Sequence, residues 1–363
     1  MPASSLQGDT VPSPDDTQIV PSATPARTLY VDTVGATVQR KSERLLVQQS
    51  TDEGRETLAA HPACDLDAVA LVGRGTHCTT PALRFCLQRD LTVLLLSRHG
   101  KIQGYLAEPD PGRVDVRRAQ YAATRRAERQ VPCARAWVGA KLHNMQRRLY
   151  RRACRTSGCP ALETALQTFD TLERRHMRAD DLDTLRGLEG AATRAYFKAW
   201  PALIQRDEPA FRFDTRDRRP PGDAVNALLG FTYALLQKDV RAGCAAAGLD
   251  PSLGLLHAPR PNTPAAVLDL MEPFRPALAD SVVLSLLNRR AVTPDDFEAR
   301  NGGIYLTKSG RTAVYKAYGQ RRTATVTPPE YDRPLPYVRV LELQARRLAR
   351  ALTEDTGFTA FRL

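Results

Sequence analysis

The side chains best suited to chemistry are one histidine and two acids that follow it. His257 precedes Asp269 and Glu272, and the two acids stand at i and i+3, so a helix would project both carboxylates from one face. Thr263 and Pro264 would provide the cap and the first residue of that helix. Two carboxylates side by side repel each other, so they need either solvation or a positive partner.

The residues around these acids favour burial over solvation. The flanking positions are apolar, namely Val267, Leu268, Leu270, Met271 and Phe274. Because an unpaired charge is costly inside a protein, a bound cation would resolve the conflict, and a solvated acidic face is the alternative. Carboxylate oxygens with a neutral imidazole suit Mg²⁺ or Mn²⁺, and either ion can act as a Lewis acid on the phosphoryl oxygens of a phosphodiester.

A third acidic ligand has to come from elsewhere in the chain, and Glu189 is the best candidate. It is a lone acid between Gly187 and Gly190, and the small residues after it leave room for a ligand or a backbone to approach. A buried glutamate paired with Arg194 explains the same residues without a metal. The residues by themselves leave both interpretations open.

The positive charge of the chain is gathered in one segment. The sequence has 52 Lys and Arg against 40 Asp and Glu, a formal net charge of +12. Residues 113–155 hold 13 of those cations and two acids, so this segment alone carries 13 − 2 = +11. The spacing of its apolar residues predicts two basic helices, and the shortage of acids favours contact with nucleic-acid phosphates over intrahelical ion pairs. A solvated arginine-rich surface is the alternative.

Composition excludes several other classes of protein. An apolar content of 42% with 25% charged residues is ordinary for a globular chain, and 363 residues favour two domains. Seven scattered cysteines do not make a secreted disulfide framework, and Cys154 with Cys159 lacks the second ligand pair of a zinc site. With no apolar run of spanning length and no signal segment, we expect a cytoplasmic protein that does not contact a membrane.

The pattern of elements predicts an α+β fold in two unequal parts. Strands are expected at 28–31, 36–40, 44–48, 67–72, 92–96 and 102–107, with a helix at 81–88 capped by Thr79 or Thr80. Helical periodicity dominates after a linker at 109–112, with a hairpin expected at 302–315 and an amphipathic helix at 335–352. We therefore expect a small β-rich N-terminal domain, 28–108, followed by a larger, mostly α-helical catalytic domain, 113–363. Residues 1–27, rich in Pro, Ser and Thr, predict a disordered tail.

Four blocks of sequence resemble one known family and occur in that family's order. They are 188–197 (LEGAATRAYF), 219–233 (RPPGDAVNALLGFTY), 254–257 (GLLH) and 268–275 (LDLMEPFR). Together with shorter matches at 28–31, 79–84 and 94–100, they make the chain similar to the CRISPR-associated adaptation endonuclease and integrase, CRISPR-associated protein one. The resemblance covers roughly residues 28 to 350, and its front half is nearest to the type I-C branch.

The resemblance implies a metal-dependent DNA endonuclease and integrase that inserts short duplex DNA spacers into the repeat array, with a DNA 3′-hydroxyl as the nucleophile. It puts Glu189, His257 and Glu272 at the family's catalytic and metal-ligand positions, Asp269 at that of an auxiliary ligand, and Mg²⁺ or Mn²⁺ as the cofactor. It also implies double-stranded DNA, a homodimer and CRISPR-associated protein two as partners. Contacts to the DNA backbone are expected from Arg117, Arg118, Arg125, Arg147, Arg148, Arg151, Arg218 and Arg219.

Several alternatives stay open from the sequence. Pro273 stands where many relatives carry a further acid, so Asp269 could be a stronger ligand than Glu272. A non-catalytic basic DNA-binding scaffold subunit would bind DNA in a salt-dependent way without needing metal, and a stand-alone nuclease would share the same site. Asn226, near the start of a mostly apolar helix, is expected to bond either a metal ligand or a neighbouring helix.

Overall fold

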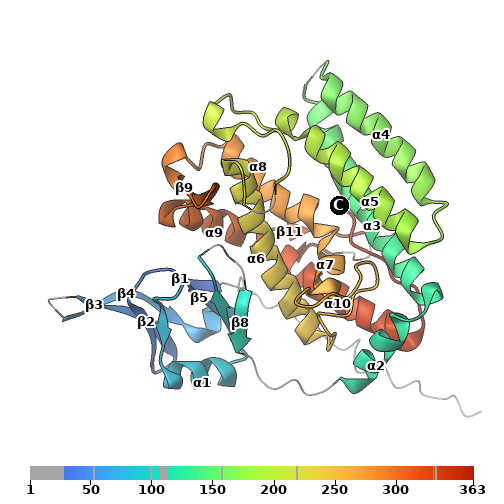
Figure 1. Cartoon of the computed structure of the whole chain (residues 1–363). Coiled ribbons are helices and arrows are strands. Elements are labelled where there is room, and N and C mark those ends of the chain that lie inside the picture. The colour runs from blue at the N-terminus through green and yellow to red at the C-terminus, as the bar shows by residue number, and fades with distance from the viewer. Residues whose placement is uncertain are drawn as a thin grey trace, which may run out of the picture.

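The computed structural model describes residues 28–51, 54–98, 100, 102–106, 113–156, 158–217, 220–329, 331 and 333–363. Within these residues the chain forms a β-rich N-terminal part and a larger helical part, which lie side by side (Figure 1). The predicted α+β fold is confirmed. The predicted tail at 1–27 and the predicted linker at 109–112 lie outside the described residues.

The N-terminal part consists of two four-stranded sheets. The first has the order β1 (Thr28–Val31), β5 (Ala68–Val72), β7 (Thr92–Leu96) and β8 (Ile102–Leu106). Its strands pair in parallel, except that β8 is antiparallel to β7. The second has the order β4 (Gly54–Pro62), β3 (Arg44–Thr51), β2 (Ala36–Lys41) and β6 (His77–Cys78). Helix α1, Thr80–Gln88, packs on both, and its cap is Thr79, as predicted. A single 3₁₀ turn, Ala63–Asp65, follows β4.

The sequence predicts the buried strands and misses two others. In β4 six of the nine residues are exposed and none is buried, so the burial alternation that marks a half-buried strand is absent, and the strand is held by its pairing with β3. Strand β6 has only two residues. An exposed edge strand is therefore difficult to predict from the hydrophobic periodicity of the sequence.

The helical part surrounds one large apolar core. Its longer helices are α2 (Val114–Ala123), α3 (Ala127–Ala153), α4 (Pro160–His176), α5 (Leu182–Lys198), α6 (Ala224–Ala246), α7 (Ala265–Met271), α8 (Asp280–Asn288), α9 (Lys308–Thr323) and α10 (Tyr337–Glu354). Its shorter elements are Trp200–Leu203, Pro209–Phe211, the π-helical turn Arg275–Ala279, Pro294–Asp296, β9 (Phe297–Arg300), β10 (Gly303–Leu306), β11 (Thr325–Val326) and β12 (Leu335–Pro336). The two predicted basic helices are α2 and α3, and the predicted amphipathic helix is α10.

Two predictions about the helical part are wrong in detail. The hairpin expected at 302–315 is formed by β9 and β10, because Asn301 and Gly302 both have positive φ and make the turn between them. Thr307 then caps α9 by accepting a hydrogen bond from the Gly310 amide, so 308–315 is helical. Helix α7 begins at Ala265 with Pro264 at the cap position and no side-chain cap, so Thr263 does not start it.

A buried group of charges joins the N-terminal part to the helical part. Asp239 of α6 accepts hydrogen bonds from Arg322 Nε at 3.1 Å and from the Tyr318 hydroxyl at 2.7 Å, both on α9. Arg322 also reaches Asp67, next to β5, at 2.7 Å, and Lys238 donates to the Thr28 hydroxyl of β1 at 2.9 Å. These paired charges hold the first sheet against α6 and α9 (Figure 1).

Candidate metal centre

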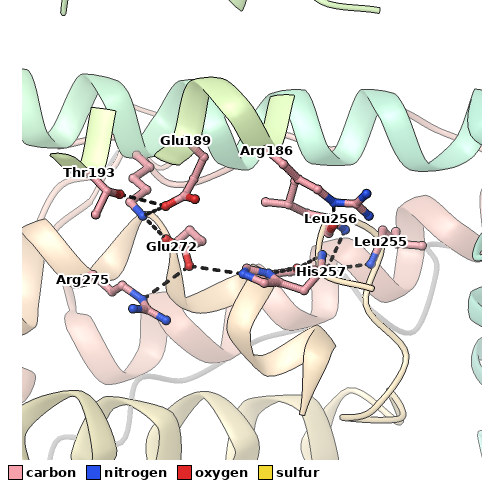
Figure 2. Close-up of polar contacts among 10 residues, drawn as sticks. Arg186, Glu189, Thr193, Leu255, Leu256, His257, Glu272 and Arg275 are labelled. Atoms are coloured by element: carbon pink, nitrogen blue, oxygen red, sulfur yellow. Dashed lines mark hydrogen bonds and ion pairs between the residues drawn. The ribbon is translucent and has the colours of Figure 1, made fainter. Parts of the chain in front are cut away.

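Two helices and one loop bring the predicted metal ligands together. Glu189 lies on α5, Glu272 is the residue that ends α7, and His257 belongs to the loop before α7. Figure 2 shows Glu189 and Glu272 facing each other, with His257 beside Glu272. The Nε2 atom of His257 lies 3.9 Å from Oε1 of Glu272. Segments far apart in the sequence thus present two carboxylates and one imidazole to the same region.

Asp269 supports the histidine loop. Its Oδ2 accepts hydrogen bonds from the amides of Leu255 at 2.6 Å and Leu256 at 3.0 Å. Its Oδ1 accepts from the His257 amide at 2.9 Å and lies 2.6 Å from His257 Nδ1. Because a carboxylate can only accept, the proton of the neutral ring belongs on Nδ1, which leaves Nε2 as a lone-pair donor directed toward Glu272.

A second contact holds the same loop to α5. Arg186 donates from Nε to the Leu256 carbonyl at 2.8 Å, one turn of helix before Glu189 (Figure 2). The loop that carries His257 is therefore fixed from both sides, by Asp269 of α7 and by Arg186 of α5. The sequence analysis places Asp269 and Glu272 on one shared acidic face, whereas in the structure each carboxylate has separate partners.

Glu272 is buried beside two cations. It is 2% exposed, yet Lys141 Nζ lies 2.5 Å from its Oε2 and Arg275 Nε lies 3.5 Å from its Oε1. Burial alone would raise the pKa of Glu272, but the charges of Arg275, Lys141 and His257 lower it to about 2. The same surroundings act on His257, where burial opposes ionisation but Asp269 and Glu272 together raise its pKa above the ordinary value.

Glu189 pairs with a lysine that the sequence analysis did not single out. Its Oε1 contacts Lys141 Nζ and accepts from the Thr193 hydroxyl at 2.9 Å, so the pairing with Arg194 that we considered is not formed. Lys141, on α3, is 2% exposed and bridges Glu189 and Glu272. The signal that could have revealed it is its type, because it is the single lysine among the 13 cations of residues 113–155.

The residues present fit a hard divalent cation. In the described part of the chain no three His, Cys, Asp or Glu side chains are clustered tightly enough to hold a metal as they stand. The ammonium of Lys141 contacts both glutamates and so takes the place of a positive charge between them. Two carboxylates and an imidazole nitrogen are donors that Mg²⁺ or Mn²⁺ accepts.

The predicted DNA-contact arginines that the structure describes fall into two groups, one near each basic helix. Arg117 and Arg118 of α2 and Arg125, just after that helix, line a cavity of about 630 Å³ together with Arg126 and Tyr121. The second group lines a cavity of about 380 Å³ at the C-terminal end of α3: Arg147, Arg148, Arg151, Arg152 and Arg155, joined by Arg289 and Arg321. None of the described residues that line the second cavity is acidic. Arg218 and Arg219 lie outside the described residues.

Asn226 does neither of the two things expected of it. It is fully buried, accepts from Arg216 at 2.7 Å and from the Asp217 amide at 3.0 Å, and donates to the Thr215 carbonyl at 2.8 Å. These bonds tie the loop before α6 to the start of that helix. Asn226 therefore positions the arginine-bearing loop and bonds neither a metal ligand nor a neighbouring helix.

The sequence of the chain matches the family described as CRISPR associated protein Cas1 over residues 29–320. This chain belongs to the Cas1 family. It is 37% identical over 339 residues to the CRISPR-associated endonuclease Cas1 2 of Rhodospirillum rubrum, covering 90% of this chain and 95% of that protein. It is 36% identical over 342 residues to a CRISPR-associated exonuclease Cas4/endonuclease Cas1 fusion of Geobacter sulfurreducens, covering 93% of this chain and 60% of the fusion.

Solved structures agree on the fold. A casposase bound to integration product superposes with a TM-score of 0.77 at 21% identity, over 92% of each chain. A chain of a Cas6-RT-Cas1–Cas2 complex superposes with a TM-score of 0.73 at 22% identity, over 92% of this chain and 35% of that one. The resemblance to the Cas1 family drawn from the four sequence blocks is confirmed. In the described part of the chain, no helix has the length and apolar character needed to cross a bilayer.

Replacing Asp269 by Asn is expected to lower the pKa of His257. The substitution removes the negative charge that holds Nδ1–H and favours the protonated ring. Titration of His257 followed by NMR in the metal-free protein measures the change. Asp207→Asn is the matched control, because Asp207 is an exposed acid between the turns Trp200–Leu203 and Pro209–Phe211. An unchanged His257 pKa in Asp269→Asn would show that Asp269 does not set the state of the ring.

Proposed function

We propose that this chain is a metal-dependent DNA endonuclease and integrase of CRISPR adaptation, which inserts short duplex DNA spacers into the repeat array. The observation that carries the proposal is the convergence of Glu189, His257 and Glu272 from three separate segments (Figure 2). Membership in the Cas1 family and the endonuclease relatives support the same chemistry. The front half of the sequence favours the type I-C branch.

In this proposal Glu189, Glu272 and the Nε2 of His257 hold one Mg²⁺ or Mn²⁺. When bound, the ion supplies Lewis-acid polarisation of the phosphodiester. Asp269 fixes the imidazole so that Nε2 faces the site, and Arg275 keeps Glu272 ionised beside it. Asp269, with both oxygens engaged by the loop, is a positioning residue in this account, and Glu272 is the ligand.

The reaction needs no nucleophile from the protein. The 3′-hydroxyl oxygen of the incoming DNA forms a new phosphodiester bond to the target phosphorus and gives up its proton. The P–O3′ bond of the target strand breaks at the same phosphorus, and its O3′ leaves and takes up a proton to become a 3′-hydroxyl. The number of phosphodiester bonds is conserved, so no energy source is required. The protein's part is to position the two strands and to stabilise the charge around the phosphorus.

The arginine surfaces of α2 and α3 support binding of double-stranded DNA. Partial burial, and then the like charges of Arg147 and Arg148, lower the pKa of Arg151. Arginines that repel one another along a helix destabilise the free protein, and bound phosphates would remove that repulsion. Arg148 is also held in place, since it donates to the Pro276 carbonyl and to the Ser281 hydroxyl.

We also propose a homodimer and a complex with Cas2. The large exposed apolar side chains of the N-terminal part support a protein–protein surface there: Val34, Leu58, Leu95, Tyr105 and Leu106. Strand β4, at the edge of the second sheet, offers unpaired backbone groups as well. The match to a chain of a complex that contains Cas2 supports the second partner.

Glu189→Gln is expected to reduce strand transfer by at least about 100-fold, because it removes one negative ligand while keeping the shape of the side chain. The assay follows a labelled duplex prespacer into a plasmid carrying a leader and repeat, with Cas2, with and without MnCl₂. Glu163→Gln is the control, since Glu163 is an exposed acid on α4. DNA binding without transfer in every condition would indicate a scaffold subunit, and cleavage without insertion would indicate a nuclease alone.

Arg151→Gln is expected to weaken DNA binding at all sequences alike and to reduce the slope of log affinity against log salt by about one. The measurement is a salt titration of duplex binding by fluorescence anisotropy. Arg174→Gln, an exposed arginine of α4, is the control for loss of one positive charge. If both variants gave the wild-type slope, the α3 arginine surface would not contact the DNA backbone.

A further inference from the structure

Among the residues that the structure describes, Lys141 is the one contact that Glu189 and Glu272 share. Its ammonium contacts Oε1 of Glu189 and lies 2.5 Å from Oε2 of Glu272, while the side chain is 3% exposed. Glu272 is equally buried, and the side chain of Glu189 is 24% exposed. The lysine thus closes the inner end of the site, and Glu189 lies nearer to solvent.

The ammonium and a divalent ion would compete for the same place. Mg²⁺ binds carboxylate oxygens at about 2.0–2.1 Å, so an ion held by both glutamates must lie between them. Lys141 Nζ takes the part of that space between Oε1 of Glu189 and Oε2 of Glu272. A positive charge and a divalent cation also repel strongly at such a separation in a buried site. The two cations therefore compete for the same pair of carboxylates.

We propose that Lys141 is a built-in counter-ion for the empty metal centre, which holds Glu189 and Glu272 together without metal and must leave them when the ion binds. Lys141 thereby weakens the affinity of the site for its ion while keeping the site formed. The proposal rests on the metal centre proposed above, but it does not depend on integration activity.

The chemistry of the side chain suits this exchange. Without any cation, two carboxylates facing each other in a buried site would repel or take up a proton. Lysine carries a compact point charge on a flexible four-carbon stem, whereas the planar guanidinium of arginine binds carboxylates through a rigid two-pronged contact. In a segment whose other 12 cations are arginines, the residue between the two glutamates is a lysine. A side chain that has to move away is better served by that flexible stem.

The test is the affinity for MnCl₂ of the full-length, DNA-free protein, measured by isothermal titration calorimetry at one fixed pH. Lys141→Met removes the competing charge with little change in side-chain length. We expect it to bind Mn²⁺ at least about tenfold more tightly than the wild type. We also expect a lower melting temperature without metal and a larger rise on adding MnCl₂. A residue with a merely structural role would, when replaced, weaken metal binding.

Lys198→Met is the matched control, because Lys198 is an exposed lysine at the end of α5. It should leave the affinity for Mn²⁺ unchanged. Lys141→Gln keeps a hydrogen-bond donor between the carboxylates and gives the same test if Lys141→Met does not fold. Equal or weaker Mn²⁺ binding in both Lys141 variants would overturn the proposal.

Glu189→Gln separates this proposal from the metal centre itself. If Mn²⁺ binding depends on Glu189 and tightens in Lys141→Met, both stand. If Mn²⁺ binding depends on Glu189 but is no tighter in Lys141→Met than in the wild type, the counter-ion role fails and the metal centre stands. If neither the wild type nor Lys141→Met binds Mn²⁺ in a way that depends on Glu189, the metal centre fails, and the proposal for Lys141 fails with it.

Discussion

The proposed metal centre depends on one ammonium group placed between two carboxylates. Glu272 is 2% exposed, so its charge has to be balanced within the protein, and Lys141 and Arg275 do so. The same ammonium also pairs with Glu189, which draws α3, α5 and the end of α7 to one point. The ammonium of Lys141 therefore links the spacing of the three helices to the proposed metal binding, and together with Arg275 it keeps Glu272 ionised.

Helix α3 connects this centre to the surfaces that would meet DNA. It has 27 residues, about 40 Å at the rise of an α-helix. Lys141 lies at its middle, and the cavity lined by Arg147 and Arg151 lies at its C-terminal end. Asn144, one turn after Lys141, donates to the carbonyls of Pro273 and Phe361, so α3 also holds the residue that follows Glu272. A shift of this helix would move the centre and the basic surface together.

The sequence predicts those site residues that are marked by their spacing and by their neighbours along the chain. The i, i+3 spacing of Asp269 and Glu272 among apolar neighbours, and the isolation of Glu189 between glycines, are local features. The pairing of both glutamates with Lys141 is not a local feature. Lys141 stands in an arginine-rich segment and contacts the glutamates only because distant helices pack together. The hairpin is a different case: Asn301-Gly302 is a strong local turn signal, and the prediction set the strands on the wrong side of it.

The central claim is that Glu189, His257 and Glu272 form one divalent-metal site. The most direct measurement is an anomalous-difference electron-density map from crystals of the full chain grown with MnCl₂. The account predicts a single strong peak bounded by both glutamates and the Nε2 of His257, with the Lys141 ammonium turned away from the carboxylates. A map without manganese between these three residues, and with Lys141 still bridging the glutamates, would contradict it.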